Sequence, residues 1–223
     1  MRFDCLTLFS EMIKPILEDS ILKRAIESNL IEVNLINFRD FSKMKHKNVD
    51  DTPYGGGNGM VLMPEPIYLA LTSIEGYEKA HKILLTPQGV TYSQAKAKEL
   101  SKYNHIILIC GHYEGFDERI RSFVDEEISI GDFILTGGEV AAMAIIDSIS
   151  RLIPGVLHNE ESAPTDSFEN NLLEAPQYTK PYDFMGQKVP DILLSGDHKK
   201  IDEWRKSESL KRTKERRPDL LEK

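Results

Sequence analysis

Short apolar runs of strand length alternate with amphipathic segments of helix length along the first half of the chain. The strand-like runs are rich in apolar and β-branched side chains and span residues 3–9, 30–38, 82–85 and 105–110. Apolar side chains recur at helical spacing in residues 15–28, and Ser93 is suited to cap a second helix that reaches Leu100. Strands that alternate with helices predict an α/β fold, in which helices cover both faces of a mostly parallel sheet.

One longer segment, residues 128–146, joins three features. An apolar strand end at Ile128 leads into a turn with the paired glycines Gly137 and Gly138, and a helix that is apolar on nearly every side follows. Such a helix must be buried, either in a core or against a partner. Glycine lets the backbone approach a ligand without an intervening Cβ. The segment therefore predicts a ligand-binding loop joined to a buried helix.

Two further loops, residues 84–89 and 110–120, also follow predicted strands directly. Ligands of parallel α/β sheets bind at the carboxyl ends of the strands, where these loops would meet the paired-glycine turn. Their small residues and free backbone groups suit an adenosine-like ligand or another ligand with neutral edges. Residues 50–60 hold four glycines, but they lack the lysine of a phosphate-binding P-loop and the glycine spacing of a dinucleotide-binding loop.

Composition changes after Gly155. Residues 158–171 are polar, with a single aromatic side chain, which is typical of a linker. Two short, charged helices are expected near the end of the chain, at residues 199–207 and 210–216. The pattern predicts three parts: an α/β domain over residues 1–157, a flexible linker over residues 158–172 and a small, mainly helical domain over residues 173–223.

Charge is distributed unevenly. The net charge is −8, but residues 199–223 hold ten Lys or Arg and six Asp or Glu, a local charge of +4 that leaves −12 on the remainder. A basic end on an acidic body is expected where one end meets phosphates, although a solvated helix surface would carry the same charges. Cys5 and Cys110 form no spaced pair, the N-terminus lacks a signal peptide's apolar core, and no apolar run could span a membrane. These features predict a soluble cytoplasmic protein.

Individual charged residues are ambiguous when they are taken one at a time. Arg151 follows the apolar helix, where a cation interacts favourably with the helix dipole, and Asp166 is suited to be a helix N-cap. Glu114 fits a helix start, while His112 and His158 belong to no metal-ligand cluster. From the residues alone, a structural role explains each of them better than a catalytic role does.

Several motifs taken together resemble those of the bacterial tRNA (guanine-N1)-methyltransferase family. The motifs are DDTPYGGGNGM at residues 50–60, TPQG at 86–89, CGHYEG at 110–115, SIGDFILTGGE at 129–139, SRLIPG at 150–155, DSF at 166–168, LSGDH at 194–198 and RRPDLL at 216–221. They cover essentially the whole chain in order, and their joint occurrence is specific. The family belongs to the SPOUT methyltransferases, so the resemblance implies a deep C-terminal trefoil knot in the parallel sheet, which known topology rules alone would argue against.

The resemblance also implies that S-adenosylmethionine binds in the knot. The chain is then expected to form a homodimer, with the acceptor site built across the subunit interface. Two positions depart from the usual family pattern, since His112 stands where arginine is usual and Phe133 where tyrosine is frequent. The implied cofactor-binding residues are Leu85, Pro87, Gly111, Tyr113, Glu114, Ile130, Gly131, Asp132, Phe133, Ile134, Leu135, Gly137 and Gly138.

The implied reaction transfers a methyl group from S-adenosylmethionine to N1 of the guanosine directly 3′ of the tRNA anticodon. Neutral guanine carries a proton on N1, so a general base must remove it. By resemblance Asp166 is this base, and Arg151 stabilises the negative charge that spreads to O6. Mg²⁺ assists the reaction in the family, but the sequence shows no ligand set for it. Contacts with the tRNA anticodon stem-loop are expected from Asp50, Gly55, Gly57, Gly59, Ser167, Lys211 and Arg216.

Two alternative functions stay open at this point. A knotted RNA methyltransferase that acts on a ribose 2′-hydroxyl would share the cofactor loops, and its product differs from N1-methylguanosine in mass fragmentation. A non-catalytic RNA-binding protein would explain the basic end but not three glycine-bearing loops beside an acidic body. A measurement of S-adenosylmethionine binding distinguishes this non-catalytic alternative from a methyltransferase.

Overall fold

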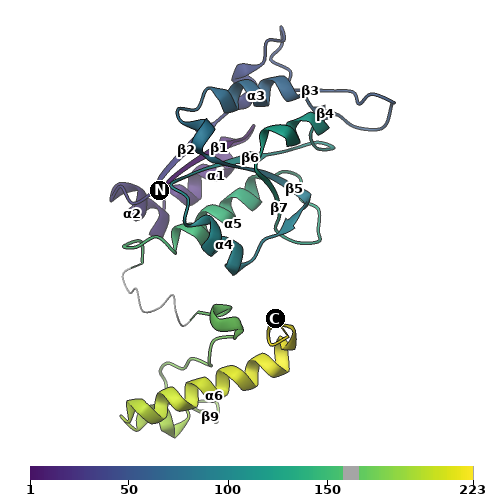
Figure 1. Ribbon diagram of the computed structural model, residues 1–223. Helices are drawn as coiled ribbons and strands as arrows, with labels where there is room; N and C mark the ends of the chain where they lie inside the picture. The colour runs from purple at the N-terminus through teal and green to yellow at the C-terminus, as the bar shows by residue number, and fades with distance from the viewer. Residues whose placement is uncertain (158–165, 223) are drawn as a thin grey trace. The chain divides into compact units, whose positions relative to one another are not determined.

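The protein consists of two compact units, Met1–His158 and Asn159–Lys223 (Figure 1). The structure, a computed structural model, describes residues 1–157 and 166–222. Residues 158–165, which include His158 and more than half of the predicted linker, lie outside the described residues.

A five-stranded sheet forms the centre of the first unit. Its strands are β1 (Arg2–Leu6), β2 (Glu32–Ile36), β5 (His81–Thr91), β6 (His105–Cys110) and β7 (Glu126–Ser129), in the spatial order β2-β1-β6-β5-β7. Every neighbouring pair is parallel. The predicted α/β fold with a mostly parallel sheet is therefore confirmed.

Helices cover both faces of this sheet (Figure 1). Four helices pack on one face: α1 (Ser10–Leu17), α2 (Ser20–Glu27), α4 (Gln94–Leu100) and α5 (Glu139–Ser150). The other face carries α3 (Pro64–Thr72) and the 3-10 turns η1 (Phe38–Phe41), η2 (Tyr77–Lys79) and η3 (Glu118–Phe123). Successive strand side chains point to opposite faces, so Leu108 joins the first core and Ile109 the second.

The apolar helix α5 is buried largely by its own unit. Its buried residues are Glu139, Ala141, Ala142, Ile145, Ile146, Ile149 and Ser150. Val140 is 42% exposed, so part of the helix remains uncovered in the single chain. The expected burial thus needs no second subunit for most of α5.

Three predicted elements differ from the structure. The helix expected over residues 15–28 is interrupted, because Asp19 is extended and begins α2 by accepting a hydrogen bond from the N–H of Ser20. The loop expected at 84–89 lies within β5. The two charged helices expected near the end form one helix, α6 (His198–Arg216). The side chains of Ile201 and Thr213 are buried where this helix packs on the rest of the second unit.

The second unit is built around α6. The other elements are η5 (Glu169–Asn171), the hairpin β8 (Asp183–Phe184) with β9 (Gln187–Lys188), η6 (Asp191–Leu194) and η7 (Pro218–Leu220). The segment before the hairpin is tied to the helix, since Leu173 donates its N–H to the Thr213 hydroxyl and accepts from Ser209. These bonds replace the larger apolar core that so small a unit cannot build.

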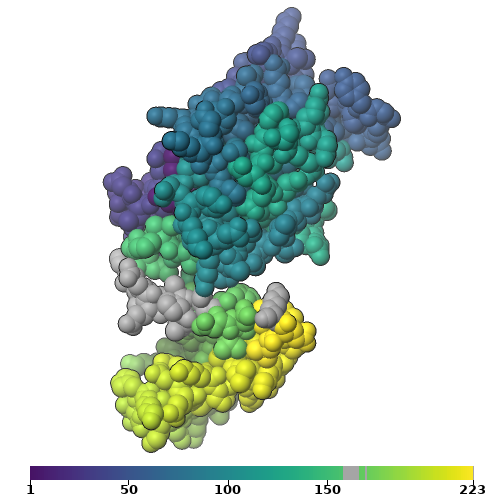
Figure 2. Space-filling model, viewed as in Figure 1, coloured from purple at the N-terminus to yellow at the C-terminus, as the bar shows by residue number. Residues whose placement is uncertain are grey.

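A short hairpin, β3 (Asp50–Asp51) with β4 (Val61–Leu62), carries the four-glycine loop. This loop projects from the body of the first unit, as the ribbon and the space-filling view both show (Figures 1 and 2). Tyr54 at its tip is fully exposed. The loop is therefore accessible to a large ligand.

Candidate active site

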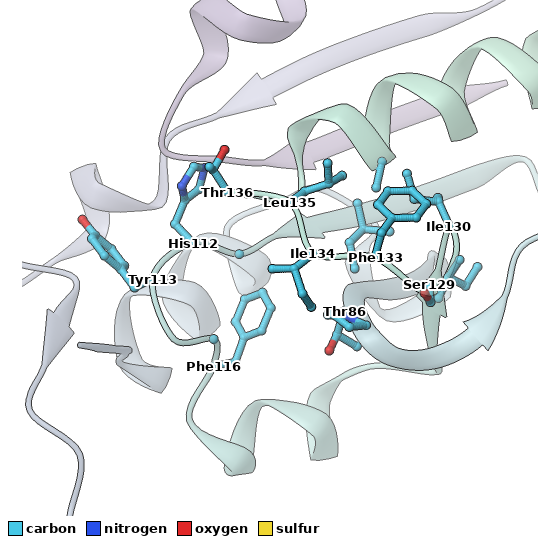
Figure 3. A pocket seen from close by; sticks show the side chains of 18 of the residues that line it. Thr86, His112, Tyr113, Phe116, Ser129, Ile130, Phe133, Ile134, Leu135 and Thr136 are labelled. Atoms are coloured by element: carbon cyan, nitrogen blue, oxygen red, sulfur yellow. The ribbon is translucent and has the colours of Figure 1, made fainter. Parts of the chain in front are cut away.

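A cavity of about 420 Å³ opens at the carboxyl ends of β6 and β7, beside the middle of β5. The loops that follow β6 and β7 face each other around it (Figure 3). Asp132, one of the thirteen residues expected to bind the cofactor, is exposed and does not line the cavity. The other twelve do: Leu85, Pro87, Gly111, Tyr113, Glu114, Ile130, Gly131, Phe133, Ile134, Leu135, Gly137 and Gly138.

Glycine is required where the two loops are closest. The N–H of Gly138 donates a 2.9 Å hydrogen bond to the carbonyl oxygen of Gly111. A β-carbon on Gly111 would lie 2.5 Å from the ring of Phe116, which closes one side of the cavity. Only a residue without a side chain allows this approach without displacing the aromatic ring.

An irregularity in β5 forms another wall. Both Leu85 and Val90 pair with Ile128 of β7, so the intervening residues bulge out of the ladder. A β-carbon on Gly89 would lie 2.4 Å from the carbonyl carbon of Glu127, which shows how tightly the bulge returns to β7. Bulges of this kind are common next to binding sites because they redirect side chains. Here the bulge brings Pro87 to the cavity.

The four-glycine hairpin is joined to the same cavity wall. Leu62 of β4 donates its N–H to the carbonyl oxygen of Gly115 at 2.9 Å, and Glu114 donates to the carbonyl oxygen of Met60 at 3.0 Å. A β-carbon on Gly59 would lie 2.4 Å from Cγ of Glu114. Gly59 is thus in contact with the cavity wall, whereas Gly55 and Gly57 lie exposed farther along the loop and Asp50 is half-buried in β3.

Sequence reasoning missed eight residues that line the cavity. They are Thr86, His112, Gly115, Phe116, Ile128, Ser129, Thr136 and Ala141. All but Ile128, which lies within β7, and Ala141 adjoin an expected residue or belong to the same loop, so loop continuity is the signal that could find those six. Ala141 reaches the cavity because it lies in the first turn of α5, which begins at its edge.

A buried polar cluster formed by Glu139, Thr7 and His112 adjoins the cavity. The carboxylate of Glu139 is fully buried and lies 2.6 Å from Oγ1 of Thr7 and 2.7 Å from Nε2 of His112. The ring of His112 packs on Phe9, with 4.5 Å between ring centroids. His112 therefore has two well-defined neighbours, Glu139 and Phe9, whereas its sequence context alone does not indicate its role.

Cys110 lies directly before Gly111 and contacts Cys5 on β1, with 3.5 Å between the sulfur atoms. Both thiols are free and buried. The contact with Cys5 and burial raise the pKa of the Cys110 thiol well above its ordinary value. A neutral thiol is a poor nucleophile, so covalent catalysis by Cys110 is disfavoured. The sequence did not indicate that the two cysteines meet, since they lie on adjacent strands 105 residues apart.

The two residues expected to be catalytic, Arg151 and Asp166, do not line this cavity. Arg151 follows the last residue of α5, whereas Glu139 begins that helix beside the cavity. Asp166 belongs to the second unit, where it is half-buried and lines a separate cavity of about 590 Å³ together with Arg205 and Lys206. Each residue has polar partners of its own.

The remaining expected tRNA contacts also belong to the second unit. The Ser167 hydroxyl accepts a 3.1 Å hydrogen bond from the N–H of Glu174, which holds the start of the unit in a turn. Lys211 and Arg216 are exposed on the last turns of α6. All three are therefore positioned by the unit that carries the basic helix.

Comparison with known proteins gives a consistent result over the whole chain. Residues 1–223 match the family model described as tRNA (Guanine-1)-methyltransferase TrmD. The chain is 59% identical over 224 residues to the tRNA (guanine-N(1)-)-methyltransferase of Geobacillus kaustophilus and 58% identical over 224 residues to that of Brevibacillus brevis, covering 100% of this chain and 92% of either relative. It is 58% identical to the enzyme of the same name from Desulfitobacterium hafniense, covering 85% of that protein. This chain belongs to the tRNA (guanine-1)-methyltransferase TrmD family.

Proposed function

We propose that this protein methylates N1 of the guanosine directly 3′ of the tRNA anticodon, with S-adenosylmethionine as the methyl donor. The observation that carries the proposal is the cavity at the ends of β6 and β7, beside the middle of β5, because twelve of the thirteen expected cofactor residues line it. Whole-chain relatives named tRNA (guanine-N(1)-)-methyltransferase support the same activity.

The cavity suits S-adenosylmethionine in size and chemistry. Its volume of about 420 Å³ falls within the range of small-molecule sites. Leu85, Ile130 and Leu135 offer apolar surface for a nucleoside ring, and the surrounding loops offer backbone groups for its polar edges. When bound, S-adenosylmethionine supplies an electrophilic methyl group on a positively charged sulfur. The protein's part is to hold that group in line with the acceptor and exclude water.

Asp166 is the proposed general base. N1 of guanine becomes nucleophilic as its proton moves to the Asp166 carboxylate. The new bond joins N1 to the methyl carbon while the carbon–sulfur bond breaks, which releases S-adenosylhomocysteine. Negative charge that spreads to O6 is stabilised by the Arg151 guanidinium.

The position of Arg151 supports a homodimer. Ala141 of α5 lines the cavity, and Arg151 lies ten residues farther along the chain, which is roughly 15 Å at 1.5 Å per residue. An arginine at that distance does not reach an acceptor beside the cavity of its own chain. We therefore propose that a second copy supplies Arg151, across an interface that covers exposed apolar side chains such as Val140.

The proposed trefoil knot and domain division rest on the family and on local features. The end of β6 and the start of α5 are held together by the bond from Gly138 to Gly111 and by the bridge between His112 and Gly137. These contacts bring together the two loops in which a knot of the SPOUT type would lie. The second unit, with one long helix and short 3-10 turns, supports a small, mainly helical domain over residues 173–223.

The basic helix α6 is the proposed tRNA contact. It carries eight Lys or Arg against four Asp or Glu. Lysine and arginine bind RNA phosphates with an affinity that falls steeply with salt. Sequence-specific readout is expected at an unpaired loop base, and the guanosine beside the anticodon is such a base.

The described residues contain no group of three or more His, Cys, Asp and Glu side chains placed to hold a metal ion. The proposal therefore assigns no step to Mg²⁺. Within those same ranges, no helix is long and apolar enough to cross a membrane. A cytoplasmic location is proposed because it follows from the substrate.

Nucleoside analysis tests this proposal. Unmodified tRNA is incubated with the protein and methyl-labelled S-adenosylmethionine, digested to nucleosides and examined by mass fragmentation. Label on the guanine base as N1-methylguanosine is the expected result. Label on the ribose would favour the 2′-hydroxyl alternative, and no transfer despite cofactor binding would contradict the proposal.

A further inference from the structure

Glu139 is a charged side chain with no exposed surface, at the first position of α5. One carboxylate oxygen lies 2.6 Å from the Thr7 hydroxyl, and the other lies 2.7 Å from Nε2 of His112. Its partners follow two different strands, β1 and β6. A buried charge without partners is costly, so these two bonds are what permits a carboxylate here.

The directions of these hydrogen bonds follow from the donors available. The Thr7 hydroxyl oxygen accepts a 2.9 Å bond from the N–H of Phe9, so its proton is free to point at Glu139. An ionised carboxylate only accepts, and its second oxygen therefore requires a hydrogen on Nε2 of His112. Glu139 thus fixes both the ring orientation and the tautomer of His112.

The pair formed by Glu139 and His112 rests directly on the cavity loop. A β-carbon on Gly137 would lie 2.2 Å from Nε2 of His112 and 2.5 Å from the Glu139 carboxylate. The backbones of His112 and Gly137 also form an antiparallel bridge. Both His112 and Gly137 line the cavity, so a shift of the imidazole moves a wall of the site.

We propose that Glu139 is a positioning residue for cofactor binding. Its carboxylate holds the His112 imidazole in place, and the imidazole in turn holds Gly137 and the loop that begins at Gly131. The inference rests on the proposed function in one respect, namely that the ligand of this cavity is S-adenosylmethionine. The tautomer of His112 does not depend on that identity.

The chain offers a matched control at the opposite end of β6. Asp4 is also fully buried, and Oδ2 of its carboxylate lies 2.6 Å from Nε2 of His105. His105 begins β6, roughly 20 Å along the strand from the cavity. Asp4→Asn removes a comparable buried charge without touching the cofactor loop.

The test compares Glu139→Gln with Asp4→Asn in the full chain. Both substitutions are expected to lower the thermal midpoint. Only Glu139→Gln is expected to raise the dissociation constant of S-adenosylmethionine, by about fivefold or more, measured calorimetrically. Glutamine can donate to Nε2, so ¹⁵N NMR above neutral pH should show His112 change from the Nε2–H to the Nδ1–H tautomer. Unchanged affinity in a destabilised Glu139→Gln, or an Nδ1–H tautomer in the unsubstituted protein, would overturn the inference.

A second pair of substitutions, which are less disruptive, tests the inference if Glu139→Gln does not fold. Thr7→Val removes one of the two bonds to Glu139, whereas Thr7→Ser keeps the hydroxyl. Weaker cofactor binding in Thr7→Val with recovery in Thr7→Ser supports the positioning role, and equal binding by both overturns it. If the unsubstituted protein binds no S-adenosylmethionine, the proposed function fails, and the His112 tautomer in the ligand-free proteins alone decides the inference.

Discussion

The N–H of Gly138 donates a 2.9 Å hydrogen bond to the carbonyl oxygen of Gly111. A β-carbon on Gly138 would lie 2.8 Å from Cα of Cys110, which is closer than real β-carbons approach backbone atoms. The residue after β6 and the residue before α5 are held in contact in this way, and both line the cavity. The shape of the site depends on that approach.

Gly138→Ala is therefore expected to displace the two loops and weaken S-adenosylmethionine binding. Overpacking costs about 1–3 kcal/mol, and each 1.4 kcal/mol is about tenfold in affinity, so if the cost falls on the bound conformation a rise of about fivefold or more in the dissociation constant is expected. Titration calorimetry measures it. Gly76→Ala is the control, because it has a φ of +78° but open space around a β-carbon, and it should cost stability alone. Equal cofactor affinity in Gly138→Ala and the unsubstituted protein would refute the close-contact argument.

Asp166→Asn is expected to lower turnover by about a hundredfold or more, because asparagine cannot accept the N1 proton. Cofactor affinity should survive, since Asp166 lies in the second unit and the cofactor cavity in the first. Single-turnover methyl transfer and equilibrium binding measure the two effects separately. Asp202→Asn, which changes an exposed carboxylate on α6, is the matched control and should retain activity. Near-normal turnover in Asp166→Asn would remove the base assignment.

Asp117 gives a prediction for pH. The side-chain hydrogen bond from Arg119 lowers the pKa of the Asp117 carboxyl below its ordinary value, against the opposing effect of burial. A lowered pKa contributes stability above the unfolded value of about 3.9, and the contribution is lost as pH falls through the folded value. Asp117→Asn keeps an oxygen for the N–H of Arg119 but removes the charge. Its thermal midpoint should lie below that of the unsubstituted protein at neutral pH and converge with it in acid. A gap that widens in acid would contradict this account.

Charge reversals on α6 test the tRNA contact without removing the helix. Deleting the helix would remove the buried side chains of Ile201 and Thr213 and is expected to unfold the unit. Lys211→Glu, and separately Arg216→Glu, should weaken tRNA binding and make the slope of log affinity against log salt shallower by about 0.7–0.9 per lost phosphate contact. Lys102→Glu gives the same change in net charge on the first unit and should leave the slope unchanged. Identical slopes for all four proteins would exclude α6 as the phosphate contact.

The sheet could be predicted because strand-like apolar runs carry their own signal. Residues 105–110 coincide with β6, and the Ser93 cap coincides with the start of α4. The break between α1 and α2 was missed because it depends on the extended backbone of Asp19, which the apolar spacing does not record. Spacing does not predict the single helix α6, because its continuity is supported by hydrogen bonds between Leu173 and the side chains of Thr213 and Ser209, despite the weak helix preference of its central serines.

The loops that surround the cavity could be placed because the carboxyl ends of parallel strands meet at one edge of a sheet. The His112–Glu139 pair could not, since it joins residues 27 positions apart through a fold that spacing does not encode. Asp132 lies in the middle of the loop that follows β7, yet it is exposed and does not line the cavity. Proximity in sequence identifies a loop but not the direction of each side chain.

Primer extension on tRNA tests the central claim most directly. A methyl group on N1 blocks the base-pairing edge of guanine, so reverse transcriptase stops beside it. After incubation of unmodified tRNA with the protein and S-adenosylmethionine, a new stop is expected at the guanosine directly 3′ of the anticodon, and it should disappear when either component is omitted. Methyl transfer without a stop at that position would contradict the account.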